Sequence, residues 1–231
     1  MNKATQLLCA HCALVFAVLL GGGIFGVTGL FPPYSPTHTA AEVLQYFQDH
    51  EVRIRVGMTL LALGSVWWWP FSAAIAMQMR RMEGPRHPLT YVQMASASGT
   101  VVAVIFPAYF WLTMTFRPDV TPAVSMQFFY DLSWLAVIGM YPPGLIQNLS
   151  IAACILAHPR PDIYPRWVGF ANLWIAAGFV PGALLPYFKT GPFAWNGAIG
   201  FWMVATFFFG WILMMWWMTV KAIQREPAAE A

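Results

Sequence analysis

The sequence has little charge. Only 9% of its 231 residues are Asp, Glu, Lys or Arg, whereas 59% are hydrophobic. A soluble domain normally carries about 25% charged residues. The mean hydropathy of +0.59, with 12 Trp and 18 Phe, argues against a soluble enzyme and a disordered chain. The formal net charge of +3 gives no support for a nucleic-acid partner. The composition is typical of a chain solvated by lipid.

Cysteine and the residue patterns of common cofactor sites are also scarce. The three Cys residues, at positions 9, 12 and 154, lie in apolar stretches and do not make a disulfide framework. Cys9-Ala10-His11-Cys12 resembles a metal-binding spacing, but a structural zinc site needs four ligands and no second Cys/His cluster supplies the others. A P-loop, a His-x-x-x-His pair and a Gly-x-Ser-x-Gly elbow are missing. We therefore expect no metal site and no cofactor.

Long apolar runs, in contrast, are abundant. Six runs are long enough to cross a bilayer, whose core of roughly 30 Å takes about 20 helical residues. They cover approximately residues 7–30, 54–79, 89–116, 124–157, 167–188 and 197–220, separated by short breaks rich in Pro and Gly. The first run could be read as a secretory signal, but it is long enough to span and has no small-x-small cleavage pattern. We predict an all-α, multi-pass membrane bundle of six transmembrane helices, forming one domain over residues 1–231.

The basic residues are distributed unevenly between the two sides of these spans. Eight lie on the side of the two termini: Lys3, Arg80, Arg81, Arg86, Arg160, Arg166, Lys221 and Arg225. Four lie on the other side: Arg53, Arg55, Arg117 and Lys189. The positive-inside rule then predicts that both termini are cytoplasmic and that the first, third and fifth loops face outward.

The first outward loop contains a helix signal. Thr39 reads as an N-cap for a short helix over about residues 40–50, with Glu42 in its first turn. Val43, Leu44 and Phe47 fall on one face of that helix. The helix either lies along the membrane interface or covers the bundle as a lid, or it is simply a structural connector.

Proline and glycine predict irregular backbone inside three spans. The fourth run carries Tyr141-Pro142-Pro143-Gly144, the fifth carries Pro181-Gly182 and Pro186, and the third carries Pro107. Each Pro removes an intrahelical hydrogen bond, so a neighbouring group must satisfy the freed carbonyl. Broken helices mark substrate sites in some transporters, and in many other membrane proteins they are plain kinks. Both interpretations stay open at this point.

Asp131 is the strongest single candidate for a functional residue. It lies inside an apolar run, where an ionisable side chain costs about 2.5–3.5 kcal/mol on insertion scales, and it shares a helix face with Gln127 and Trp134. Arg53 or Arg55, at the outer start of the second run, could reach its depth. The sequence therefore predicts either an Asp–Arg pair that fixes helix register or a functional pocket.

Three amides form a second polar set, made of Gln147 and Asn148 in the fourth run and Asn172 in the fifth. Such amides join helices by hydrogen bonds, or bind a carbonyl or hydroxyl of a small ligand if they face a cavity. The candidate ligand-binding residues are Asp131, Gln127, Trp134, Arg53, Arg55, Asn148 and Asn172. An outward-facing vestibule would gather Tyr34, Arg53, Arg55, Arg117, Asp131 and Lys189.

Three stretches of the sequence carry a family resemblance. They are residues 188–197 (Phe-Lys-Thr-Gly-Pro-Phe-Ala-Trp-Asn-Gly), residues 165–169 (Pro-Arg-Trp-Val-Gly) and the Phe31-Pro32-Pro33 loop. Over most of its length the chain resembles an uncharacterised family of polytopic membrane proteins of actinobacteria and proteobacteria. The resemblance implies a helical bundle in the bacterial cytoplasmic (inner) membrane. It implies no activity and no catalytic residues.

These patterns lead to three hypotheses about function. The first is a transporter or binding protein for a small apolar metabolite, whose partners are the lipid bilayer and that hydrophobic ligand. The second is a membrane-embedded enzyme acting on a lipid or isoprenoid-like substrate, with Asp131 as general acid. The third is an accessory subunit, which predicts a protein partner and no internal cavity. The sequence predicts no nucleic-acid partner and leaves the oligomeric state open.

Overall fold

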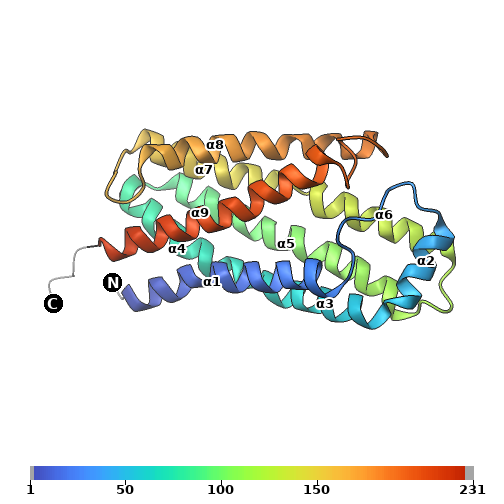
Figure 1. The fold of residues 1–231 in the computed structure, drawn as a ribbon. Coiled ribbons are helices and arrows are strands. Elements are labelled where there is room, and N and C mark those ends of the chain that lie inside the picture. Colours follow the sequence, from blue (N-terminus) through green and yellow to red (C-terminus); the bar gives the residue numbers. More distant parts are fainter. Residues whose placement is uncertain (1–2, 227–231) are drawn as a thin grey trace.

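The computed structural model describes residues 3–226, and within that range the chain forms helices without any β-strand. Six helical segments lie side by side along the bundle (Figure 1) and are long and apolar enough to cross a membrane. These spans one to six are Lys3–Val27, Glu51–Glu83, Pro88–Phe116, Ala123–Ala157, Arg166–Tyr187 and Ala198–Gln224. The predicted six-span, all-α membrane bundle is confirmed.

Only span three is a single uninterrupted α-helix, α5 (Pro88–Phe116). In the other spans the helix changes geometry or breaks. Span one is α1 (Lys3–Gly21) followed by the π-helix η1 (Gly22–Val27), and span two is α3 (Glu51–Ser65) followed by α4 (Trp68–Glu83). Span four is α6 (Ala123–Gly139) followed by α7 (Pro142–Ala157). Span five is α8 (Arg166–Phe179) followed by the 3₁₀-helix η2 (Val180–Tyr187), and span six is the π-helix η3 (Ala198–Met203) followed by α9 (Val204–Gln224).

The proline positions explain some of these interruptions. Pro142 and Pro143 begin α7 immediately after α6 ends, where their missing N–H groups are tolerated. Pro181 and Pro186 lie in the 3₁₀ segment that replaces the last turns of α8. Pro107, in contrast, lies within α5 without ending it. The breaks predicted in spans four and five are therefore present, and the prediction of irregular backbone in span three is wrong.

The short helix α2 (Ala40–Asp49) covers the end of the bundle opposite the two termini (Figure 1). Its predicted N-cap is confirmed, because Thr39 Oγ1 accepts from Glu42 N and the Glu42 carboxylate accepts from Thr39 N. Val43, Tyr46 and Phe47 are buried, and α2 packs against α6. Burial raises the pKa of Tyr46 to about 12, so its hydroxyl stays protonated and can donate to a backbone carbonyl.

Glycine permits a direct backbone contact between spans one and two. A Cβ added to Gly23 of η1 would lie 2.6 Å from Gly57 O, and one added to Gly57 would lie 2.7 Å from Gly23 O. Both distances are too short for a real side-chain contact. The two backbones therefore touch directly, which fixes η1 against α3.

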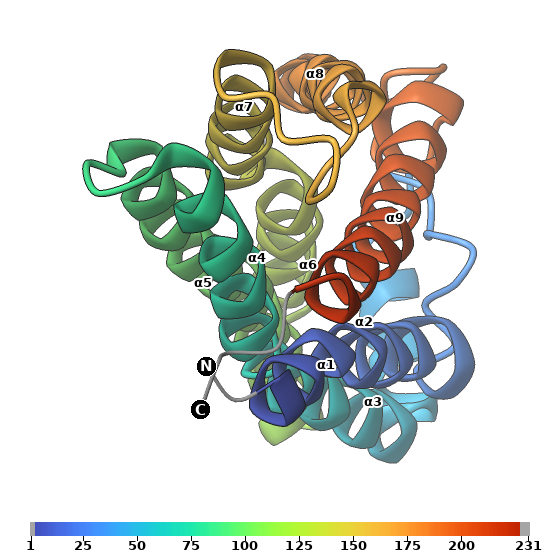
Figure 2. The same ribbon diagram turned by 90° about the vertical axis from the view of Figure 1, so that its left-hand side faces the viewer.

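The opposite end of the bundle is held together by polar side chains. Gln78 Nε2 donates to Gln6 Oε1 at 2.8 Å, and Gln6 Nε2 donates to Glu226 at 3.0 Å. Arg81 forms an ion pair with Glu226 at 3.9 Å. These contacts connect α1 and α4 to the segment after α9. Figure 2, viewed from this end, shows α9 between α1 and α8.

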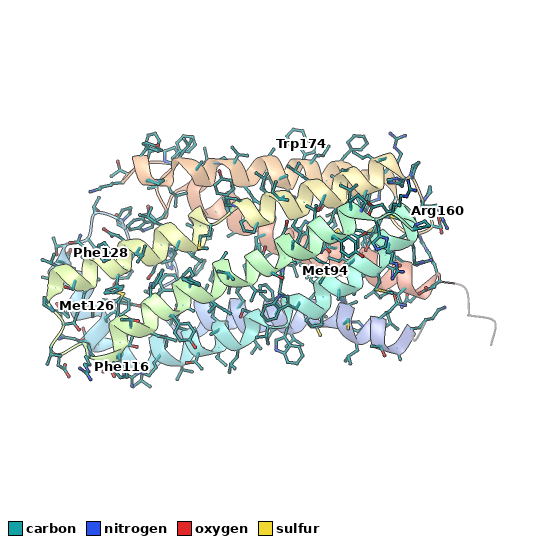
Figure 3. The ribbon with its side chains drawn as sticks, turned by 180° about the vertical axis from the view of Figure 1, so that it is seen from behind. Met94, Phe116, Met126, Phe128, Arg160 and Trp174 are labelled. Atoms are coloured by element: carbon teal, nitrogen blue, oxygen red, sulfur yellow. The ribbon has the colours of Figure 1, made fainter. Side chains whose placement is uncertain are left out.

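The outer surface of the bundle is apolar along its length. Trp174 is 75% exposed and Phe128 is 64% exposed, and both stand on the outside (Figure 3). Arg160, which is exposed and paired with Asp162, lies at one end. A monomeric soluble protein rarely exposes so much contiguous apolar surface. This distribution fits a bundle whose flanks contact lipid.

Candidate functional site

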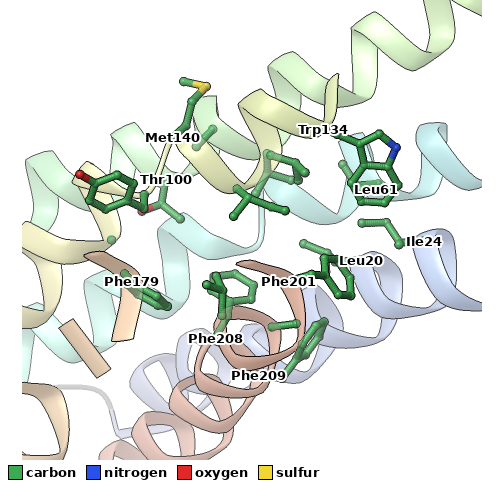
Figure 4. A pocket seen from close by; sticks show the side chains of 18 of the residues that line it. Leu20, Ile24, Leu61, Thr100, Trp134, Met140, Phe179, Phe201, Phe208 and Phe209 are labelled. Atoms are coloured by element: carbon green, nitrogen blue, oxygen red, sulfur yellow. The ribbon is translucent and has the colours of Figure 1, made fainter. Parts of the chain in front are cut away.

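The interrupted spans surround an apolar cavity of about 150 Å³. It lies between the middle of the bundle and the end that carries α2. Every span contributes to its wall: Ile24 and Phe25 of η1, Leu61 of α3, Thr100 of α5, Trp134 of α6, Phe179 of α8 and Phe208 of α9. Figure 4 shows these side chains converging from opposite sides, with Thr100, Met140 and Phe179 toward one end and Trp134, Leu61 and Ile24 toward the other.

The cavity lies where the helices change geometry. Its wall includes residues on both sides of the α1–η1 boundary, residues of the α6–α7 junction, and the last residue of α8. A regular helix packs its side chains in continuous ridges, whereas a break or π-turn interrupts that packing. The same breaks in transporters commonly surround a binding site within the membrane.

The wall of the cavity carries no ionisable carboxylate, amine, guanidinium or imidazole group. The residues of the wall with polar side-chain atoms are Thr100, Tyr141, Trp111 and Trp134. Trp111 and Trp134 pack edge to face with ring centroids 5.3 Å apart. Val137, Met140 and Phe209 are only half-buried, so the cavity is not sealed from the bundle surface. Such a site suits an uncharged molecule with an apolar body.

A buried polar set lies directly behind the wall at the Thr100 end. Thr100 Oγ1 is 3.5 Å from Gln147 Oε1, and Asn148 Nδ2 donates to Gly144 O at 2.8 Å. Thr100 and Gly144 both line the cavity. Gln147 Nε2 and Asn148 Oδ1 are buried and have no hydrogen-bond partner among residues 3–226. The amides are therefore next to the cavity and only partly satisfied.

Asp131 is half-buried and is not part of the cavity wall. Lys189, which follows η2, is a charged group that acts on it electrostatically. Arg55 instead pairs with Glu51 and donates to a backbone carbonyl of α5, and Arg53 Nε donates to Val27 O at 3.1 Å. The structure thus does not form the predicted Asp131–Arg pair, because the two arginines have other partners.

The remaining predicted site residues lie in different parts of the bundle. Gln127 Nε2 donates to His38 O at 3.2 Å, near the α2 end. Asn172 joins helices, because its Oδ1 accepts from Trp211 Nε1 at 2.8 Å. Trp134 alone of the seven candidates lines the cavity, and Asn148 lies just behind it.

None of the predicted vestibule residues lines the cavity, although Tyr34 and Arg53 both lie near Tyr46 and Lys189 acts electrostatically on Asp131. The Tyr34 ring packs against the Tyr46 ring, with centroids 4.6 Å apart, and the Arg117 guanidinium lies 5.5 Å from the centre of the Phe116 ring. The cavity wall, in contrast, consists largely of aromatic and aliphatic residues that sequence reasoning did not single out. The Pro and Gly positions in spans four and five were the signal that could have located it.

Comparison of the chain with protein-family models, with curated proteins and with solved structures finds no match. The fold and the site therefore define the class on their own. The protein is a multi-pass α-helical membrane protein with an apolar, ligand-sized cavity among its spans.

Proposed function

We propose that the protein binds a small, uncharged, apolar molecule in this cavity and serves as a carrier or transporter for it in the bacterial inner membrane. One observation carries the proposal: the interrupted segments of the spans converge on a cavity whose wall has no carboxylate, amine, guanidinium or imidazole group. Binding of a charged metabolite there would leave its charge unpaired in a low-dielectric site, which is costly.

The distribution of Lys and Arg supports an orientation with both termini in the cytoplasm. The cavity then lies toward the outer half of the membrane, in the half of the bundle whose end α2 covers. Breaks in the spans allow segments on either side of the cavity to move relative to one another. Such movement would open the cavity to alternate sides, as transport requires.

The two other hypotheses have less support. A membrane-embedded enzyme with Asp131 as general acid needs that carboxyl at the substrate, but Asp131 is not in the cavity wall. An accessory subunit without a ligand predicts a filled bundle, whereas this bundle contains a cavity.

Photolabelling in lipid nanodiscs tests the proposal. The probe is phenyl(trifluoromethyl)diazirine, a small neutral molecule that inserts into nearby side chains when illuminated. We expect labelling of Met140 and Phe208 that excess non-photoreactive trifluoromethylbenzene reduces, because both residues line the cavity. Ala205→Trp should abolish this competable labelling by filling the cavity, since Ala205 is in its wall.

Ala153→Trp is the matched control, because Ala153 is exposed on α7 and lies outside the cavity wall. It should leave labelling of Met140 unchanged. Equal labelling of Met140 in the wild type and in Ala205→Trp would refute binding in the cavity. Uptake of the same probe into liposomes, compared between these variants, then distinguishes a transporter from a binding protein.

A further inference from the structure

The end of the bundle that carries the two termini has an excess of positive charge. Within residues 3–226 it holds eight Lys and Arg residues and three carboxylates, and each carboxylate already has partners. Glu83 accepts from two backbone N–H groups at the start of α5. Asp162 pairs with Arg160, and Glu226 pairs with Arg81. The remaining basic residues form no ion pair in the described part of the chain, and they are Lys3, Arg80, Arg86, Arg166, Lys221 and Arg225.

Two of these unpaired residues, Arg166 and Lys221, lie at one level on neighbouring helices. Hydrogen bonds fix the register of α8 against α9. Trp211 Nε1 donates to Asn172 Oδ1 at 2.8 Å, and the hydroxyls of Tyr164, just before α8, and Thr219 are 2.8 Å apart. Because the helices are antiparallel, this register places Arg166 level with position 217 of α9.

The ammonium group of Lys221 lies at the same level. Its Nζ is 3.6 Å from the centre of the Trp217 ring, so the side chain of Lys221 turns back by one helical turn. Arg166 is exposed. Axes of packed helices are about 8–10 Å apart, a gap that the long side chains of Arg and Lys can reach into from both helices.

Aromatic and apolar side chains continue the same face toward the middle of the bundle. Trp167 and Trp217 are 49% and 47% exposed, and Phe170, Trp174 and Leu213 follow them at 50%, 75% and 51%. Indole rings are enriched at the level of lipid headgroups. Cations at the rim, indoles beneath them and apolar side chains below match the order of phosphate, glycerol and acyl chain in a phospholipid.

The charge selects among phospholipids. Phosphatidylcholine carries a quaternary ammonium beside its phosphate, and this cation would lie near the unpaired basic residues. Phosphatidylglycerol has the phosphate without that cation. Basic pockets between transmembrane helices bind anionic headgroups on the same principle.

We infer that an anionic phospholipid binds at the rim of the α8–α9 face, with its phosphate between Arg166 and Lys221 and an acyl chain along Phe170 and Leu213. This inference is independent of the proposed function, because none of these residues lines the cavity.

Native mass spectrometry of the full chain in detergent tests the inference. The protein is titrated with phosphatidylglycerol or with phosphatidylcholine that carries the same acyl chains. We expect the first phosphatidylglycerol to bind roughly tenfold more tightly, as two basic residues near an anionic headgroup would give. Excess inorganic phosphate should not displace the lipid, because it has no acyl chain to bury.

The double variant Arg166→Gln with Lys221→Gln should remove most of this preference. Arg80→Gln with Arg86→Gln is the matched control, because it removes two unpaired charges from the same end of the bundle but not from the α8–α9 face. The control should keep the preference. All four side chains are at least partly exposed, so the substitutions leave the core unchanged.

Four results would overturn the inference. Equal affinity for the two lipids would show that the headgroup charge is not recognised. Equal losses in both double variants would show only a diffuse effect of charge. Displacement of the lipid by inorganic phosphate would indicate a site for a soluble anion. A lipid-free dimer that is lost in the Arg166→Gln and Lys221→Gln variant would assign this face to a second copy of the chain.

Discussion

The contact between Gly57 of α3 and Gly23 of η1 gives a direct test of how the cavity wall is positioned. Gly57→Ala adds a Cβ that would lie 2.7 Å from Gly23 O. The opposing atom belongs to the backbone, so it cannot rotate away as a side chain would. Thr28, which follows η1, also contacts this position, and its hydroxyl donates to Ile24 O at 2.7 Å. The substitution must therefore move η1 away from α3.

The magnitude follows from two opposing effects. Overpacking a tight contact costs about 1–3 kcal/mol. Replacing Gly by Ala in a helix returns about 0.5–1 kcal/mol of backbone entropy. Taking the middle of each range, we therefore expect Gly57→Ala to lower the free energy of unfolding by roughly 1 kcal/mol, with an upper limit of about 2.5 kcal/mol. Gly26→Ala is the matched control, because Gly26 is exposed on η1 and an added Cβ meets nothing within 4 Å.

The free energy of unfolding of both variants is measured on the detergent-solubilised protein. The mole fraction of sodium dodecyl sulfate is increased, and unfolding is followed by tryptophan fluorescence. Gly26→Ala should be as stable as the wild type or slightly more stable. Because Ile24 and Phe25 of η1 line the cavity, Gly57→Ala should also weaken competable photolabelling of Met140. A Gly57→Ala protein with wild-type stability, or equal losses in both variants, would refute the reasoning.

Three further predictions concern polar side chains. Gln93 is fully buried, and within the described part of the chain neither of its amide atoms has a hydrogen-bond partner. Gln93→Met should therefore raise the free energy of unfolding by about 1–3 kcal/mol in the same assay, and destabilisation would show that the amide has a partner. Trp211→Phe and Asn172→Leu each break a 2.8 Å hydrogen bond and should each cost about 1–2 kcal/mol, but the double mutant should cost less than their sum. The hydrogen bonds from Thr39 lower the pKa of Glu42, so the stability that Glu42 contributes is complete above its usual pKa of about 4.3 and is lost as pH falls through the lowered value. Thermal unfolding as a function of pH should show this loss in the wild type and a smaller one in Thr39→Ala.

Much of the fold follows from the sequence because two strong signals determine it. Apolar runs longer than a bilayer core can only be helices, since every backbone polar group must be satisfied within the segment. The six spans therefore agree with the predicted runs to within a few residues at most ends. The capping box at Thr39 is equally local, because it depends only on Thr39 and Glu42 three residues later.

The interruptions of spans one and six have no comparable signal, whereas the break in span two lies beside a proline, since Pro70 is in the first turn of α4. The π-helices η1 and η3 contain no proline, and η1 is fixed by a contact with Gly57, which lies 34 positions beyond Gly23 in the chain. Pro107 shows the reverse case, since a proline inside α5 does not interrupt it. Local sequence therefore located the proline breaks of spans four and five, but the break beside Pro70 in span two and the two π-helices were not predicted.

The candidate site was harder to predict for a geometric reason. Counting residues along a helix gives the depth of Asp131, which suggested that Arg53 or Arg55 could reach it. Depth does not fix the direction in which a side chain points around the bundle axis. The structure gives both arginines partners elsewhere. Trp134 and Asn148 were chosen for their residue types, and only the structure shows that they lie at or next to a cavity.

The chemistry of the cavity follows from how the interruptions are stabilised. Each break frees backbone carbonyls that lipid cannot satisfy. At η1 the Thr28 hydroxyl donates to Ile24 O, and near the end of α3 the Ser65 hydroxyl donates to Ala62 O. Within α7, one turn after its start, the Asn148 amide donates to Gly144 O. Each hydroxyl uses its only proton for this purpose, so the polar groups at the breaks are directed to the backbone and the wall remains apolar. Asn148 differs because its amide has a second polar atom, Oδ1, which has no hydrogen-bond partner among residues 3–226.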